Sequence, residues 1–150
     1  MIWGGDKKVQ DIIKIKPNKF SIDIPFHDKY SLSIINLDKL SSLNNKNYNK
    51  QIYNFFKDAF FMDQNACGSP HLIIFLGKKK KNNEKKKFWK NLSILVKEKY
   101  DQENISILDK FNQFNEDCLN KNNIKKINLT NNPIYIAELK RINNEIINYR

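Results

Sequence analysis

Hydrophobic and polar residues alternate along the chain in two different periods. Apolar residues spaced three or four apart predict helices, whereas strict alternation or short apolar runs predict strands. The predicted helices lie within residues 6–16, 48–60, 88–100, 107–118 and 139–149, and the predicted strands within residues 1–3, 20–24, 30–35, 71–76, 124–129 and 133–136. Because helices and strands follow one another in turn, the pattern predicts an α/β or α+β domain, and we take α/β as the expected fold class.

The most informative stretch joins the predicted helix at 48–60 to the apolar run at 71–76. A continuous apolar run of this length is typical of a strand that is covered on both faces. Between them, Cys67 stands between Ala66 and Gly68, so no bulky chain neighbour screens its thiol. We expect Gly68 to give this turn backbone conformations that other residues avoid. Any chemistry of the chain is therefore expected at this turn.

Three other segments are predicted to be connections. Gly4 and Gly5 form a turn between a very short strand and the first helix, which Pro17 ends. Residues 26–29 are expected to form a turn, and residues 39–47 a polar connection. A strand of two or three residues does not form a sheet by itself.

Length and composition limit the class of protein. With 150 residues, of which 40% are hydrophobic, the chain can bury one core, so we expect one domain or part of one. No signal peptide is recognisable, and apolar runs such as 72–76 are too short to span a bilayer, so a soluble cytoplasmic protein is expected. Cys67 and Cys118 show no metal-ligand or redox spacing, so no metal site is expected.

The formal charge of +11 is compatible with a small basic module that binds nucleic acid. However, the positive charge is carried almost entirely by Lys, which lacks the bidentate guanidinium that specific phosphate and guanine contacts favour. The basic run Lys78–Lys87 is better interpreted as a solvated loop that leads into a helix, with Phe88 and Trp89 on the core face of that helix. Nucleic acid is therefore the alternative partner and not the favoured one.

Cys67 has two competing interpretations. A thiol becomes a nucleophile when nearby cations or amide donors stabilise its thiolate, and the turn at Gly68 and Ser69 offers such donors. Free cysteines are nevertheless more often small buried hydrophobes, as we expect for Cys118 on its apolar helix face. His71 is a weaker candidate for an activating base, because at the start of a strand its side chain need not face the thiol. From the residues alone, the interpretation of Cys67 as a buried hydrophobe is favoured.

Three short motifs resemble one enzyme family. Gln64–His71 resembles the nucleophile segment of the fatty acyl-CoA reductases of the LuxC type, which are associated with bacterial bioluminescence and have non-luminous relatives. Trp3–Asp6 is similar to the glycine turn late in the cofactor-binding domain of that family, and Phe26–Ser31 resembles the loop and strand that enter its catalytic domain. The motifs occur in the family's order and cover about the first half of the chain.

The resemblance implies an architecture of the aldehyde dehydrogenase superfamily and an oxidoreductase activity. Residues 1–16 would be the tail of a nucleotide-binding domain and residues 17–150 a partial catalytic domain. Cys67 would attack the thioester of a fatty acyl-CoA, expel CoA and hold the acyl group until hydride from NADPH releases a fatty aldehyde. Gly4 and Gly5 would contact the cofactor, and the backbone N–H of Cys67 would be one donor to the carbonyl oxygen.

The chain also departs from the family pattern. No Gly-rich phosphate-binding loop follows a strand, so most of the NADPH site is missing from this sequence. Gly68 stands where closer relatives usually have Ser. We therefore expect a fragment, a split gene product completed by another polypeptide, or a decayed copy. A non-catalytic remnant or assembly partner is the remaining alternative.

Overall fold

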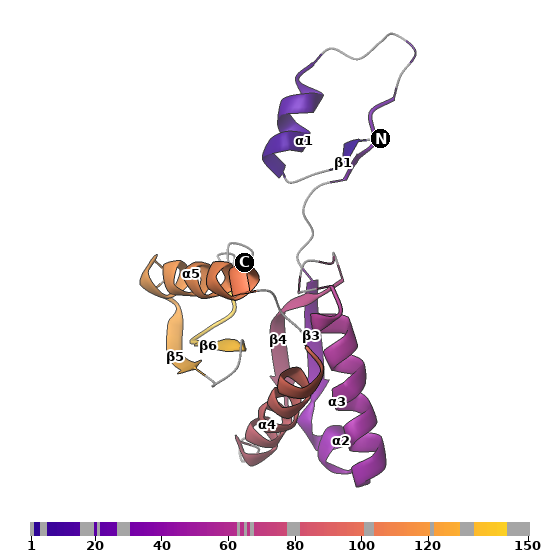
Figure 1. The fold of residues 1–150 in the computed structure, drawn as a ribbon, viewed down its shortest axis with the longest axis vertical. Helices are drawn as coiled ribbons and strands as arrows, with labels where there is room; N and C mark the ends of the chain where they lie inside the picture. The colour runs from indigo at the N-terminus through magenta and orange to yellow at the C-terminus, as the bar shows by residue number, and fades with distance from the viewer. Residues whose placement is uncertain are drawn as a thin grey trace. The chain divides into compact units, whose positions relative to one another are not determined.

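The computed structural model describes two compact units, Met1–Tyr30 and Ser31–Arg150, which are treated separately below (Figure 1). The described residues are 2–3, 6–15, 20, 22–26, 31–62, 64, 66, 68–77, 82–100, 104–120, 122–129 and 134–143. Within them, none of the helices combines the length and the apolar character that crossing a bilayer requires.

The first unit is a short strand–helix–strand arrangement. Strand β1 (Ile2–Trp3) pairs in parallel with β2 (Pro25–Phe26), and helix α1 (Asp6–Ile13) lies between them in sequence. Val9 is fully buried on the inner face of α1. The partner strand that residues 2 and 3 require is therefore supplied from within the same unit.

The prediction of a strand at 20–24 is wrong for the residues that the structure describes there. Phe20 and Ile22 are 95% and 86% exposed, and residues 22–24 have no strand pairing. Pairing begins only at Pro25, because β1 offers two residues to pair with. Phe26, predicted to begin a turn, lies in β2, whereas residues 27–29 of that turn lie outside the described residues.

The second unit begins with a parallel strand pair joined by helices. Its elements are β3 (Ser31–Asn36), α2 (Leu37–Ser41), α3 (Asn45–Phe60) and β4 (Pro70–Leu76). Leu32 pairs with Leu72 and Asn36 with Leu76, so the two strands run in the same direction. Parallel neighbours need a crossover connection, usually helical, and α2 and α3 supply it. This mixed helix and sheet architecture is compatible with the predicted α/β class.

Asparagine side chains begin both crossover helices. The Asn36 side-chain oxygen accepts hydrogen bonds from the N–H groups of Asp38 and Lys39, at 3.0 and 3.1 Å. In the same way Asn44 accepts from the N–H of Asn47 at 2.9 Å. These bonds satisfy N–H groups that have no partner within the helix. The predicted polar connection at 39–47 is therefore wrong, because its polar residues cap and form helices.

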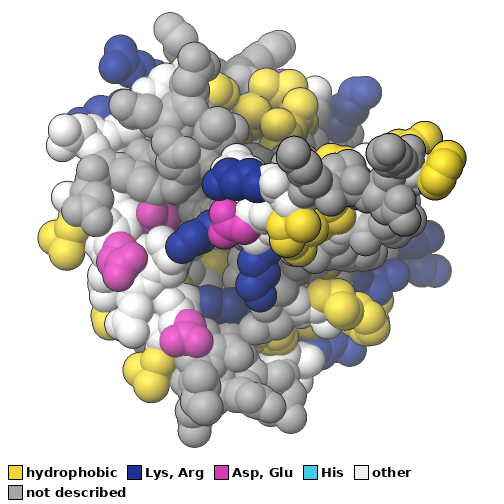
Figure 2. Space-filling view, turned by 90° about the horizontal axis from the view of Figure 1, so that it is seen from above, with side chains coloured by type: hydrophobic (Ala, Val, Ile, Leu, Met, Phe, Trp, Pro, Cys, Tyr) yellow, Lys and Arg dark blue, Asp and Glu magenta, His cyan; other side chains and the backbone are white. Residues whose placement is uncertain are grey.

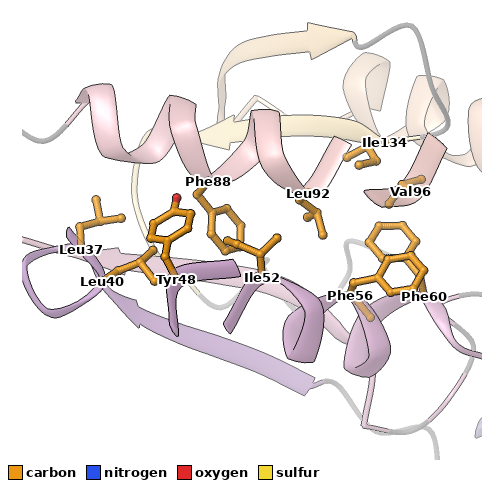
Figure 3. Packing of buried hydrophobic residues seen from close by; sticks show 11 residues of the cluster. Leu37, Leu40, Tyr48, Ile52, Phe56, Phe60, Phe88, Leu92, Val96 and Ile134 are labelled. Carbon is orange, nitrogen blue, oxygen red and sulfur yellow. The ribbon is translucent and has the colours of Figure 1, made fainter. Parts of the chain in front are cut away.

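The core lies between α3 and α4 (Asn82–Lys99). In Figure 3, Phe88, Leu92 and Val96 point from α4 towards the aromatic and aliphatic side chains of α3. The buried cluster comprises Leu37, Leu40, Tyr48, Ile52, Phe56, Ala59, Phe60, Phe88, Leu92, Val96 and Ile134. Ile35 and Phe75 of the strand pair pack against this cluster, so the helices cover one face of the sheet.

The opposite face of the strand pair is apolar and accessible. Leu32 and Ile34 of β3 are 51% and 59% exposed, and Leu76 of β4 is 49% exposed. In the part of the chain that the structure describes, the strand at 71–76 is therefore not covered on both faces as its apolar run predicts.

The remaining elements are helix α5 (Asn104–Asn120) and the antiparallel strands β5 (Ile124–Leu129) and β6 (Tyr135–Leu139). The rings of Phe111 and Phe114 lie 5.7 and 5.4 Å from the ring of Tyr135, which packs the helix on β6. The prediction that a helix begins at Leu139 is wrong, because this residue pairs with Ile124 and residues 140–143 are not helical. The rest of that predicted helix lies outside the described residues.

Candidate functional site

The predicted thiol turn lies between the end of α3 and the start of β4. The N–H of Phe61 donates to the carbonyl of Lys57 and closes the last turn of α3, and Pro70 begins β4. The predicted order of helix, turn and strand is confirmed. Cys67 itself lies outside the described residues, as do Asp63 and Asn65, whereas its chain neighbours Ala66 and Gly68 are described.

Ser69 attaches this turn to the helix. Its side chain is only 1% exposed, and its hydroxyl donates to the main-chain carbonyl of Asp58 at 3.1 Å. The last four carbonyls of a helix have no donor within the helix, and the Asp58 carbonyl is one of them. The Ser69 N–H donates to the carbonyl of Ala66 at 2.9 Å. The N–H and the hydroxyl of Ser69 were both expected to be available as donors to the thiol. Each already has an acceptor, the carbonyl of Ala66 and the carbonyl of Asp58, respectively.

The unusual backbone conformation of the turn is at Gln64 and not at Gly68. Gln64 has a φ of 61°, in the left-handed region that side chains disfavour. Gly68 has no left-handed φ, and a Cβ added to it would meet no atom within 4 Å. The expectation that this turn depends on the conformational freedom of Gly68 is therefore wrong. A Ser or Ala side chain would fit at this position.

An open hollow of about 300 Å³ lies at the turn. Its lining includes both described neighbours of Cys67, Ala66 and Gly68. The apolar residues that line it come from β3, α3, the turn and β4: Leu32, Phe55, Phe61, Met62, Ala66 and Pro70. Lys57 and Asp58 of the last turn of α3 add one positive and one negative charge. The hollow is therefore mostly apolar and carries no net charge.

Comparison with known proteins decides the family. The family model described as acyl-CoA reductase (LuxC) matches residues 1–99, which is more than half of the chain. The chain belongs to the LuxC acyl-CoA reductase family. No curated protein and no solved structure matches it. The LuxC match includes Gly4 and Gly5 of the first unit and Cys67 of the second. It extends to the end of α4, beyond the three motifs on which the resemblance is based.

His71 does not line the hollow of this LuxC-family chain. It is the additional residue of an irregularity in the β3–β4 pairing, since Ser31 pairs with Pro70 and Leu32 with Leu72. Its side chain is exposed, whereas Pro70 contributes to the hollow. The geometry therefore gives no support to His71 as the base that activates the thiol.

Cys118 provides a contrast with Cys67. It lies half-buried on α5, where burial raises the pKa of its thiol and the carboxylate of Asp117 raises it further. A raised pKa lowers the thiolate fraction at neutral pH, and the thiolate is the reactive form. The environment of Cys118 therefore disfavours a nucleophilic role, in agreement with its expected place on an apolar helix face.

Two lysines of the basic run contact groups of the chain itself. Lys85 forms an ion pair with Glu138 at 2.8 Å and lies over the Phe75 ring, and Lys87 lies 4.4 Å from the centre of the Tyr48 ring. The residues at 78–81 lie outside the described residues. Figure 2 shows Lys and Arg side chains near the centre of this face, around an acidic side chain, and others along its right-hand margin. These contacts do not favour the nucleic-acid alternative.

Gly4 and Gly5 lie outside the described residues, between β1 and α1. The strand before them and the helix after them are as predicted. Their expected contact with a cofactor stays a prediction.

Proposed function

We propose that this chain accepts the acyl group of a fatty acyl-CoA on Cys67, for reduction to the fatty aldehyde. Membership of an acyl-CoA reductase family supports the substrate and the reaction class. The observation that carries the assignment to Cys67 is the apolar hollow, whose lining includes both of its chain neighbours.

In the proposed reaction the Cys67 thiolate attacks the thioester carbonyl carbon. A new carbon–sulfur bond forms, the bond to CoA breaks, and CoA leaves as a thiolate that takes up a proton. The acyl group then remains on Cys67 as a thioester. Negative charge develops on the carbonyl oxygen during the attack, so a backbone donor such as the Cys67 N–H would accelerate it.

We propose NADPH as the reductant. When bound, it supplies the hydride that converts the acyl thioester to the aldehyde and returns Cys67 to its thiolate. Gly4 and Gly5 lie between β1 and α1, and the strand after this helix, β2, pairs in parallel with β1. In dinucleotide-binding folds the turn between such a strand and helix approaches the cofactor. No Gly-rich phosphate-binding loop occurs within residues 1–150, so Gly4 and Gly5 would contribute only part of that site.

We further propose that residues 17–150 are part of a catalytic domain of the aldehyde dehydrogenase type, preceded by the tail of a nucleotide-binding domain at 1–16. Support comes from the parallel β3–β4 pair and from the position of the thiol turn directly before β4. The contact boundary between the two units lies later, after Tyr30.

The test is the release of CoA from decanoyl-CoA, measured by chromatography after incubation with the purified chain. We expect release of close to one equivalent without NADPH, because acyl transfer precedes reduction. Cys67→Ala should abolish the release, and the matched variant Cys118→Ala should retain it. Absence of release from the folded chain would contradict the proposal and favour a non-catalytic remnant.

A further inference from the structure

We propose that one end of the β5–β6 hairpin docks on a bilayer of anionic phospholipids, a binding role that is independent of the proposed acyl transfer. The hairpin and α5 follow the LuxC match, which ends at residue 99, so family membership does not explain the surface that they form. We call this surface the basic hairpin end. Its exposed side chains are Lys125, Lys126, Lys140, Arg141, Leu119 and Ile142.

Asn123 joins the two chain segments of the basic hairpin end. It is 6% exposed, its carbonyl accepts the N–H of Lys140 at 2.9 Å, and its side chain donates to the carbonyl of Arg141 at 2.9 Å. The ammonium of Lys140 also donates to the carbonyl of Asn122 at 2.8 Å. The residues that follow β6 are therefore held beside the start of β5 by hydrogen bonds of the backbone and of a buried side chain.

Lys125 lies at an irregularity in the pairing of the same strands. Ile124 pairs with Leu139 and Lys126 with Glu138, so Lys125 is the additional residue between two paired ones. An additional residue of this kind bends its strand and changes the direction of its side chain. The exposed ammonium of Lys125 is therefore not part of the regular strand ladder.

Positive charge is in excess at the basic hairpin end. Besides its four cations, the described part of the hairpin contains one acidic residue, Glu138. Glu138 already forms an ion pair with Lys85 of α4 at 2.8 Å. The acidic residues that precede the hairpin on α5 are Glu116 and Asp117, and only Glu116 is exposed. This end of the hairpin therefore favours a ligand that presents several negative charges.

Two large apolar side chains lie beside these cations. Leu119, in the last turn of α5, is 84% exposed, and Ile142, directly after Arg141, is 68% exposed. Aliphatic side chains have no flat ring on which nucleobases stack. Apolar residues flanked by Lys and Arg are instead typical of surfaces that enter the boundary between lipid head groups and acyl chains.

The remaining features also favour a lipid surface. Arg141 is one of only two arginines in the chain, and a guanidinium binds a phosphate through two parallel hydrogen bonds. Stable protein interfaces have about 20–30 residues on each side, many more than this surface offers. The combination of cations and two apolar side chains therefore fits lipid head groups better than nucleic acid or a protein.

The test is flotation of the full chain with vesicles of phosphatidylcholine, or of phosphatidylcholine mixed with phosphatidylglycerol. We expect binding to the mixed vesicles only, weakened at least tenfold at about 0.5 M salt, because salt screens surface charges. Removal of two cations in Lys125→Gln/Arg141→Gln should weaken binding about 25-fold, or about fivefold for each cation. The matched control Lys46→Gln/Lys50→Gln removes two exposed cations of α3 and should change binding less than about twofold.

A second pair of variants tests the apolar contribution. Leu119→Ser should weaken binding to the mixed vesicles about fivefold, because part of the leucine side chain leaves water on docking. Leu76→Ser removes an exposed leucine at the end of β4 and should leave binding unchanged. Both leucines are at least about half exposed, so neither substitution opens the core.

Several results would overturn the proposal. Equal binding to both kinds of vesicle, or equal weakening by the two double variants, would show that the total charge of +11 and not the basic hairpin end decides binding. Release from the vesicles by millimolar glycerol 3-phosphate, beyond the effect of its ionic strength, would indicate a site for free phosphate. Capture of the chain from the vesicles by a DNA duplex at equal phosphate concentration, lost in Lys125→Gln/Arg141→Gln, would identify nucleic acid as the partner.

Discussion

Removal of the Ser69 hydroxyl should weaken the attachment of the thiol turn to α3. In Ser69→Ala the donor to the Asp58 carbonyl is lost, while the backbone bond to Ala66 is retained. A hydrogen bond contributes about 0.5–1.5 kcal/mol net, whereas leaving a buried carbonyl without its donor costs about 1–3 kcal/mol in all. Because the pair is only partly buried, the lower end applies, and we expect a loss of about 1.5 kcal/mol in the free energy of unfolding.

Urea unfolding followed by far-UV circular dichroism measures this loss. With a slope of about 2 kcal/mol per M, the midpoint should fall by about 0.7 M. Ser42→Ala is the matched control, because the Ser42 hydroxyl also donates to a main-chain carbonyl, that of Lys39 at 2.8 Å, but is exposed. It should change the free energy by less than about 0.5 kcal/mol. Equal midpoints for Ser69→Ala and Ser42→Ala would refute the reasoning.

Three further substitutions test separate features of the second unit. Gly68→Ala should stabilise the chain by about 0.4–1 kcal/mol in urea unfolding, because its backbone is not left-handed and its Cβ has space; a clear loss would contradict this geometry. Tyr48→Phe should raise the melting temperature by a few degrees, because the buried Tyr48 hydroxyl has no hydrogen-bond partner among the described residues and its removal abolishes a desolvation cost; a fall in melting temperature would indicate a satisfied hydroxyl. Glu138→Gln should cost about 1 kcal/mol at pH 7, because the hydrogen bond from Lys85 lowers the pKa of the Glu138 carboxyl and stabilises its charged form in the fold. This stabilisation is present above the usual carboxyl pKa and is lost as the pH falls through the lowered pKa of Glu138. The urea midpoints of the unsubstituted chain and Glu138→Gln should therefore converge below about pH 4. A constant difference between the two midpoints down to pH 3 would refute the assignment.

The helices and strands with strong periodic signals could be predicted from the sequence. The aromatic face of α3 repeats at helical spacing, and β4 is a short continuous apolar run. Both elements occur where these patterns place them. The failures arose where pairing or capping decided the structure. The described residues of 20–24 lie outside any strand, although the Ile24 carbonyl accepts the Ile2 N–H at 3.0 Å. Asn44 caps a helix within the stretch 39–47, whose polarity indicated a connection.

The position of the candidate site could be predicted, but its surroundings could not. The helix, thiol turn and strand order followed from local patterns. The hollow requires Leu32 to lie near Phe61 and Met62, and only the pairing of β3 with β4 brings these residues together. The anchor from Ser69 to the Asp58 carbonyl spans eleven residues and has no local sequence signal.

The most direct test of the central claim is the mass of the intact chain after incubation with decanoyl-CoA, followed by peptide mapping. The account predicts one decanoyl adduct on the peptide that carries Cys67, removable by hydroxylamine as a thioester is. The adduct should persist in Cys118→Ala and be absent from Cys67→Ala. An adduct that maps to Cys118, or one that survives Cys67→Ala, would contradict the account.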